Sequence, residues 1–185
     1  IGDVLPSIPE FHRNHITRPV NLNENLTFLR AWQELFSGDS FVYDYPLGRA
    51  HYGDFGYQHI SRIISDDIEQ LNNLKLNGYI SCQELRSGLP NFLPNYVMGR
   101  KLWDVSLSFE SIQKEYMEAA YGSHEQEIMN YLVQLSDLCS CDYFNGKGDR
   151  INSEIALRME KAAQLTRSFA STLSDNTKDA SNAPV

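Results

Sequence analysis

Residues 40–86 constrain the fold of this chain most, because they have the pattern of a strand, a helix and a second strand in immediate succession. Apolar and β-branched residues occupy 40–45 and 78–82, and an amphipathic segment at 57–76 separates them. Consecutive strands joined by a helix usually lie parallel in one sheet. The stretch therefore predicts an α/β fold whose functional groups gather at the carboxyl ends of the strands.

Polar and aromatic side chains occupy both predicted strand ends. They are Tyr43, Asp44 and Tyr45 at the first end, and Gln83, Glu84 and Arg86 at the second. Asp44 or Glu84 can hydrogen-bond a sugar hydroxyl in this position, or act as an acid or base if its pKa is raised. In the alternative interpretation Glu84 only forms an ion pair with Arg86 or with another cation. Alternation along a strand would place Tyr43 and Tyr45 on the face opposite Asp44.

Three further residues are candidates for ligand contact. The ring of Tyr52, like that of Tyr45, offers a flat surface on which a sugar can stack, although a tyrosine can equally belong to the core. Arg13 and His15 share a face if residues 8–17 form a strand, which suits a polar ligand. His12 and His15 would then lie on opposite faces without a third ligand nearby, so we predict no metal site and no cofactor.

The chain is acidic, and its 185 residues are enough for one domain. Its net charge is −8, and no run of Lys or Arg alternates with aromatic residues, which argues against nucleic-acid binding. No apolar run approaches the roughly 20 residues that span a bilayer. Cys82, Cys139 and Cys141 fit neither a disulfide framework nor a paired zinc site, so we expect buried or incidental thiols.

Outside the strand segments the apolar residues recur at helical spacing. Helices are predicted at 23–36 and 89–103, where Pro94 requires a kink or a later start. Ser108 is expected to cap a helix that ends at Gly122, and residues 123–126 have the capping-box pattern of the next helix. A last helix is predicted at 150–173, followed by a frayed tail.

Four segments, taken in order, carry a family resemblance. They are 41–45 (Phe-Val-Tyr-Asp-Tyr), 78–88 (Gly-Tyr-Ile-Ser-Cys-Gln-Glu-Leu-Arg-Ser-Gly), 93–104, and 115–122 (Glu-Tyr-Met-Glu-Ala-Ala-Tyr-Gly). Together they resemble the carboxyl-terminal part of a large bacterial family of glycosidase-like barrels. That family, long an uncharacterised domain, shares features with α-glucuronidase barrels and includes the family-163 endo-β-N-acetylglucosaminidases that act on complex N-glycans. The resemblance runs from about Arg13 to Gly122.

The resemblance implies the fold and the domain organisation. Segments near Phe11, Phe41 and Tyr79 would be the last three strands of a (β/α)8-type barrel, with the other strands upstream. Residues 1–104 would form this barrel portion, 105–175 an α-helical extension and 176–185 a flexible tail. Because the chain opens at Ile1 with a pattern typical of the middle of a domain, we expect a fragment of a longer protein.

The resemblance also implies a function. The family is expected to use a retaining mechanism assisted by the substrate's N-acetyl group, with an acid/base carboxylate upstream, so no catalytic residue is assigned here. Its implied substrate contacts are Asp44, Glu84, Tyr45, Arg13 and His15, to which position adds Tyr52 and Arg86. The chain would thus be a fragment of a glycoside hydrolase acting on N-acetylglucosamine-containing glycans, inactive alone. The alternative is a non-catalytic carbohydrate-binding or helical interaction module.

Expected partners follow from these interpretations. They are a glycan or oligosaccharide, the upstream part of the same polypeptide and a second copy of the chain. A second copy could associate through exposed strand edges, because an incomplete barrel leaves strands unpaired. No targeting signal predicts the localisation. A glycan-degrading protein would be secreted or periplasmic, and a cytoplasmic location is the alternative.

Overall fold

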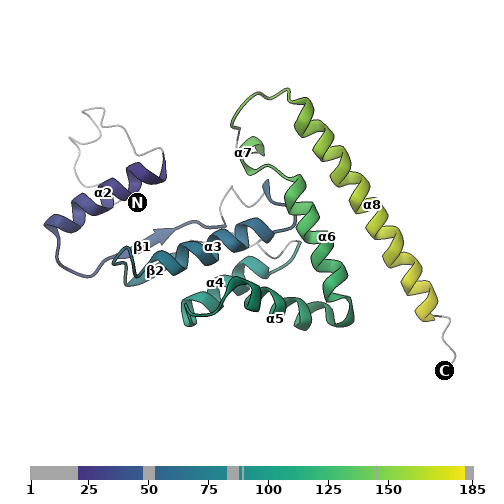
Figure 1. Cartoon of the computed structure of the whole chain (residues 1–185), viewed down its shortest axis with the longest axis horizontal. Coiled ribbons are helices and arrows are strands. Elements are labelled where there is room, and N and C mark those ends of the chain that lie inside the picture. The colour runs from purple at the N-terminus through teal and green to yellow at the C-terminus, as the bar shows by residue number, and fades with distance from the viewer. Residues whose placement is uncertain (1–20, 48–52, 83–87, 89, 145, 182–185) are drawn as a thin grey trace. The chain divides into compact units, whose positions relative to one another are not determined.

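The computed structural model describes residues 21–47, 53–82, 88, 90–144 and 146–181, and within them the chain is mainly helical (Figure 1). The elements are α2 (Leu22–Leu35), β1 (Phe41–Asp44), α3 (Gln58–Gln70), β2 (Gly78–Ser81), α4 (Leu93–Trp103), α5 (Phe109–Tyr121), the 3₁₀ turn η2 (Gly122–His124), α6 (Glu125–Leu138), α7 (Cys141–Phe144) and α8 (Ser153–Ser181). None of these helices is both long and apolar enough to cross a bilayer.

The chain divides into two compact units that are not continuous in sequence. One unit comprises the residues up to Tyr45 together with Leu71–Cys82, and its described elements are α2, β1 and β2. The other comprises Pro46–Gln70 and the residues from Gln83 onward, and it contains α3 and all the helices from α4 to α8. The chain thus leaves the first unit after β1 and returns to it for β2.

In the first unit β1 and β2 pair in parallel. Phe41 lies opposite Gly78 and Asp44 opposite Ser81, and backbone hydrogen bonds extend the pairing at both ends, from Asn77 N to Ser40 O (2.7 Å) and from Cys82 N to Asp44 O (2.9 Å). Gly78 suits this pairing, because a Cβ there would lie 3.0 Å from the Cβ of Phe41. The strand, helix and parallel strand expected from residues 40–86 are therefore present locally.

The prediction of a (β/α)8 barrel remnant is wrong. The described residues contain one sheet, made of β1 and β2 with four residues each, and a barrel requires strands that continue around a closed ring. The physical reason lies in the apolar spacing, since the buried hydrophobic residues of the second unit recur mostly at helical spacing and pack between helices. The strand predicted near Phe11 lies outside the described residues.

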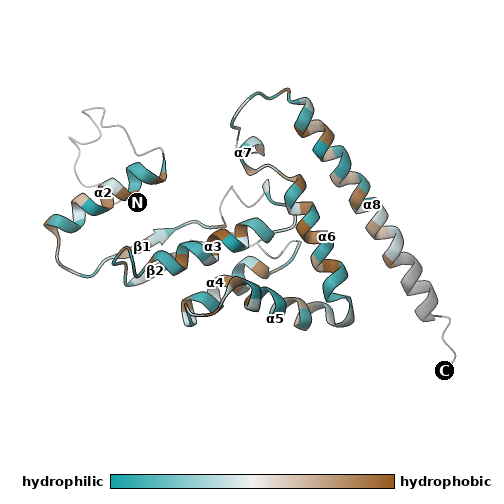
Figure 2. Ribbon diagram, in the orientation of Figure 1, coloured by the Kyte–Doolittle hydropathy of each residue, from teal (hydrophilic) through white to brown (hydrophobic). Residues whose placement is uncertain are grey.

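The second unit has a helical core. α3 packs against α4 and α6, α4 against α5, α5 against α6, and α6 against α8. Figure 2 shows hydrophobic residues recurring among hydrophilic ones along α3, α6 and α8. The most buried apolar side chains come from four of these helices and the segment before α3: Leu47, Ile64, Leu93, Val97, Ile112, Met117 and Leu132. These helices therefore share one hydrophobic core.

Helix boundaries follow the sequence signals in most places. Ser108 caps α5 by accepting the N–H of Ser111 (3.1 Å), and α4 begins late, with Pro94 in its first turn. The capping box expected at 123–126 is wrong, because η2 ends at His124, α6 begins at Glu125, and His124, the N-cap of α6, makes no side-chain cap. α8 continues to Ser181, beyond the predicted end at residue 173.

A buried lysine closes the end of α4. The side chain of Lys101 is 1% exposed, and its Nζ donates to the carbonyls of Val105 (2.8 Å) and Leu107 (2.9 Å), with Glu69 3.4 Å away. A buried ammonium group is tolerated only where its hydrogen bonds are satisfied. Lys101 therefore holds the turn that leads from α4 into α5.

We expect Lys101→Met to lower the free energy of unfolding by about 1–3 kcal/mol, because it leaves two inward carbonyls without their donor. Urea unfolding followed by circular dichroism at 222 nm measures this change. Lys114→Met is the matched control, because the side chain of Lys114 is 71% exposed and should change stability little. Equal stability of the two variants would contradict the role given to Lys101.

Candidate functional site

The carboxyl end of β1 carries two exposed aromatic rings. Tyr43 and Tyr45 are 47% and 53% exposed, and their rings meet edge to face with centroids 5.2 Å apart. Hydrogen bonding, first to Tyr45 and second to Cys82, raises the pKa of Tyr43 above its ordinary value. Ile80, opposite Tyr43 in the strand register, is exposed as well. The strand end therefore presents an aromatic and apolar surface with two phenol hydroxyls.

Asp44 lies between the two tyrosines and is half-buried. Its Oδ1 accepts the N–H of Tyr45 (2.7 Å), and its Oδ2 accepts the hydroxyl of Tyr79 (3.2 Å) from β2. Alternation along the strand predicts that Tyr43 and Tyr45 lie on the face opposite Asp44. The burial pattern agrees, because both tyrosines are exposed and Asp44 between them is half-buried. In this structure Asp44 joins the strand ends and supports the ring surface.

Five of the predicted site residues cannot be placed. Arg13, His15, Tyr52, Glu84 and Arg86 lie outside the described residues. Asp44 and Tyr45, which are neighbours in sequence, are therefore the predicted contacts that have a described geometry, at the end of β1. The proximity of Asp44 and Glu84, expected from adjacent parallel strands, stays a prediction.

The most buried carboxylate of the described chain belongs to Asp54, just before α3. It is 1% exposed, and its Oδ1 accepts the N–H of Tyr57 (3.0 Å) and the hydroxyl of Ser136 (2.5 Å), while Oδ2 accepts the N–H of Ile60 (2.9 Å). Ser136, on α6, in turn accepts the N–H of Gln58 (3.1 Å). Asp54 thus caps α3 and fastens it to α6.

Further buried polar groups continue this network toward α4 and α5. Gly56 O accepts from the amides of Gln58 (3.2 Å) and Asn91 (3.3 Å), and Asn91 Oδ1 accepts the N–H of Leu93 at the start of α4. Gln113 of α5 donates to Gln58 Oε1 (2.6 Å). Because these groups satisfy one another, the network holds helices together and leaves no vacant polar group to bind a ligand.

The described end of the loop before α3 packs inward. A side chain at Gly56 would collide with the carbonyl of Leu132 on α6, so only glycine permits this approach. Asp54 and Ser136 were not among the candidate residues. The available signal was an aspartate placed before an apolar helical pattern, which is typical of an N-cap.

Two thiols lie beside this network and are poorly reactive. Burial raises the pKa of Cys139 to about 11, and burial together with the nearby charge of Asp54 raises the pKa of Cys141. Phe55 N donates to Cys139 Sγ (3.4 Å), and the cysteines are free, as expected. The described residues also contain no group of three or more His, Cys, Asp or Glu side chains that could hold a metal ion.

No family model, curated protein or solved structure matches this chain. The glycosidase resemblance therefore rests on the sequence segments alone, and function has to be argued from the described geometry. That geometry offers two different polar centres: a satisfied internal network around Asp54, and an exposed aromatic surface at the end of β1.

Substitution of Asp54 tests whether the network is structural. Asp54→Asn replaces one acceptor oxygen with an amide that faces N–H or O–H donors, so we expect the free energy of unfolding to fall by about 1–3 kcal/mol. Urea unfolding followed by circular dichroism measures the loss. Asp66→Asn, at an exposed position of α3, is the control and should leave stability within about 0.5 kcal/mol.

Alkylation tests the order of thiol reactivity. Iodoacetamide at pH 8 should modify the exposed Cys82 first, because a pKa of about 11 leaves roughly one Cys139 thiol in a thousand as the reactive thiolate. Raising the pH toward 11 should raise the share of Cys139 that reacts. Peptide mass spectrometry measures each site, and labelling of Cys139 as fast as Cys82 at pH 8 in the folded protein would contradict this order.

Proposed function

We propose that this chain contributes a glycan-binding surface built on Tyr43 and Tyr45 at the end of β1. The observation that carries the proposal is the pair of exposed tyrosine rings, held edge to face 5.2 Å apart. The C–H bonds on one face of a pyranose ring can pack against an aromatic face, which gains apolar contact while the sugar hydroxyls stay hydrated. Two rings at an angle offer such a face and a second wall beside it.

Asp44 gives this surface its rigidity. Its carboxylate accepts both the N–H of Tyr45 and the hydroxyl of Tyr79, so the strand end cannot rotate without breaking one of these bonds. A binding surface that is ordered before the ligand arrives loses less conformational entropy on binding. The phenol hydroxyls supply the polar contacts that orient a sugar.

The resemblance supports a finer proposal. In it the surface serves a glycoside hydrolase acting on N-acetylglucosamine-containing glycans, to which Glu84 and Arg86 after β2, and Arg13, His15 and Tyr52, add contacts. Asp44 in this proposal positions Tyr45 and contacts substrate, and it is not the proton donor. The described part of this chain then binds substrate without performing hydrolysis.

A helical interaction module is the second candidate, favoured by the surface of α2. Apolar side chains of this helix and its C-cap remain exposed: Leu22, Phe28, Trp32, Leu35 and Phe36. A contiguous apolar surface of this kind commonly marks a protein partner. The candidates differ in what they bind, since the tyrosines serve the glycan and the face of α2 would serve a protein.

We expect Tyr45→Ala to weaken binding of a complex-type N-glycan about tenfold, because it removes one stacking face worth about 1–1.5 kcal/mol. Isothermal titration calorimetry with the free glycan measures the change. Trp103→Ala is the matched control: this aromatic residue is 88% exposed in the other unit, and its loss should leave the affinity unchanged.

Mass spectrometry of glycans from a complex-type glycoprotein incubated with this chain separates binding from hydrolysis. Binding without release supports the proposal as stated. Released glycan would show that this chain completes a catalytic site and would overturn its non-catalytic part. Equal loss of affinity in Tyr45→Ala and Trp103→Ala, or no binding by the wild-type chain, would remove the glycan assignment and leave the helical interaction module.

A further inference from the structure

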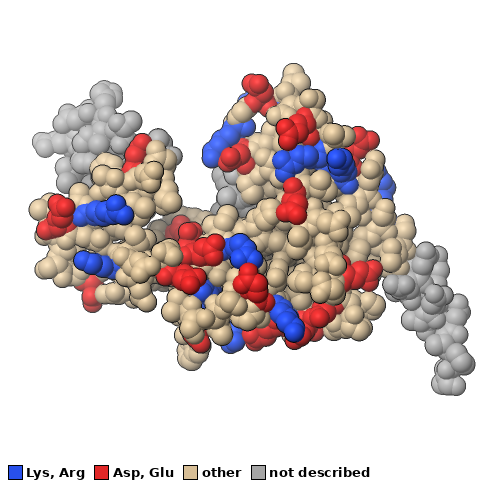
Figure 3. Space-filling model, in the orientation of Figure 1, with Lys and Arg blue, Asp and Glu red and all other residues tan. Residues whose placement is uncertain are grey.

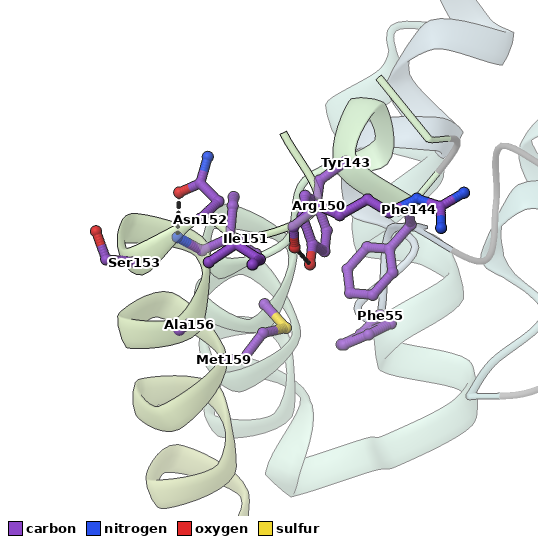
Figure 4. A pocket seen from close by; sticks show the side chains of 10 residues that line it. Phe55, Tyr143, Phe144, Arg150, Ile151, Asn152, Ser153, Ala156 and Met159 are labelled. Atoms are coloured by element: carbon purple, nitrogen blue, oxygen red, sulfur yellow. Dashed lines mark hydrogen bonds between the residues drawn. The ribbon is translucent and has the colours of Figure 1, made fainter. Parts of the chain in front are cut away.

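A second surface, far in sequence from β1, is an open depression whose lining residues are mostly exposed. It lies in the second unit, where α7 and the start of α8 meet the segment before α3, and it has a volume of about 570 Å³ (Figure 4). Drug-sized ligands occupy pockets of about 300–1,000 Å³. The lining is Phe55, Tyr143, Phe144, Ile151, Ile155, Met159 and Ala156, with Arg150, Asn152 and Ser153 as its polar members.

Aromatic side chains form one wall of the pocket. The rings of Phe55 and Phe144 are tilted at 49° with centroids 5.3 Å apart, and Phe144 meets Tyr143 edge to face at 5.6 Å. Met159 points from α8 toward Phe55 across the pocket (Figure 4). An apolar or aromatic ring fits this space, because it can pack on the phenylalanine rings on one side and on the flexible thioether of Met159 on the other.

Two hydrogen bonds hold the pocket's shape. Tyr143 donates from its hydroxyl to Arg150 O (2.9 Å), which ties α7 to the segment before α8. Asn152 Oδ1 accepts the N–H of Ile155 (3.0 Å) and so caps α8. Both bonds are drawn in Figure 4 and involve residues that line the pocket. These bonds fix the backbone of Arg150 and the side chain of Asn152 at the edge of the pocket.

One positive charge belongs to this pocket. The side chain of Arg150 extends toward Phe144 (Figure 4), and no ion pair or side-chain hydrogen bond with another described residue engages its guanidinium. The nearby acid Asp142 is already paired with Lys147 (2.8 Å). Elsewhere on the face drawn in Figure 3, Lys and Arg are interspersed with Asp and Glu. Arg150 thus gives an otherwise apolar pocket a cation able to bind a carboxylate or sulfonate through two N–H groups.

We propose that this pocket binds a small aromatic or aliphatic molecule with one anionic group. The apolar body would lie between Phe55, Phe144 and Met159, and the anionic group would pair with Arg150. This site is independent of the glycan surface, because it shares no residue with Tyr43, Asp44 or Tyr45.

Two fluorescent probes that differ in one charge test the proposal on the whole chain. The first is 1-anilinonaphthalene-8-sulfonate, and the second is N-phenyl-1-naphthylamine, which has the same ring system without the sulfonate. We expect Arg150→Gln to weaken binding of the sulfonate probe about fivefold and to leave binding of the neutral probe unchanged. Rising salt should weaken binding of the sulfonate probe and leave binding of the neutral probe unchanged, because salt screens an ion pair with the exposed Arg150.

A second variant locates the binding. Ala156 lines the pocket at an exposed position of α8, so Ala156→Trp should fill the pocket without disturbing the core. We expect this variant to weaken binding of both probes at least tenfold. Circular dichroism at 222 nm verifies that the variant is folded. Arg167→Gln, an exposed arginine farther along α8, is the charge control and should alter neither probe.

The outcomes separate this proposal from its rivals. Unchanged binding of both probes in Ala156→Trp would place them on another apolar surface and overturn the proposal. Equal weakening of both probes by Arg150→Gln would overturn the anionic part of the ligand class. Tyr45→Ala should leave the probes unaffected, and Ala156→Trp should leave glycan binding unaffected, so failure of one site does not decide the other.

Discussion

The second unit depends on the buried carboxylate of Asp54. This one side chain accepts two backbone N–H groups at the start of α3 and the hydroxyl of Ser136 on α6. Tyr57, one of its donors, is buried with φ at 61°, a conformation that costs a bulky residue about 1–2 kcal/mol. The carboxylate and the surrounding core offset that cost, because each donor would otherwise be buried without a partner. Helices that are far apart in sequence are thereby held in one arrangement.

The first unit is stabilised differently. Among its described residues the buried apolar side chains are Leu29 and Leu76, while Trp32, Phe41 and Tyr45 remain exposed. Two parallel strands of four residues bury little surface, and parallel sheets are normally covered on both faces. Exposed aromatic residues in such a unit are available for a ligand or a partner, whereas the buried network around Asp54 in the other unit is already satisfied. Binding is therefore argued from the strand end and not from the buried network.

Local sequence signals predicted the helices well. Ser108 capped α5 as expected, and the apolar spacing located α2, α3, α4, α6 and α8, although α3 ends at Gln70 instead of residue 76 and α8 continues to Ser181 instead of ending at residue 173. The barrel failed as a prediction, because a strand–helix–strand pattern defines one parallel pair and carries no information about further strands. Of the predicted site, Asp44 and Tyr45 fall within the described residues, and their role in binding stays a prediction. Asp54 was missed, because its importance comes from Ser136, a contact that spans 82 positions.

The sequence by itself determined the helical periodicity, the parallel strand pair, the acidic charge and the absence of a disulfide pattern. These are properties of neighbouring residues, set by backbone propensity and side-chain spacing. The tertiary structure alone decided that Asp54 is buried, that Lys101 serves two carbonyls, and that Phe55 and Arg150 border the same pocket. Such contacts join positions 4 to 95 residues apart, and which groups meet depends on how the helices pack, because burial and hydrogen bonding are satisfied for the fold as a whole.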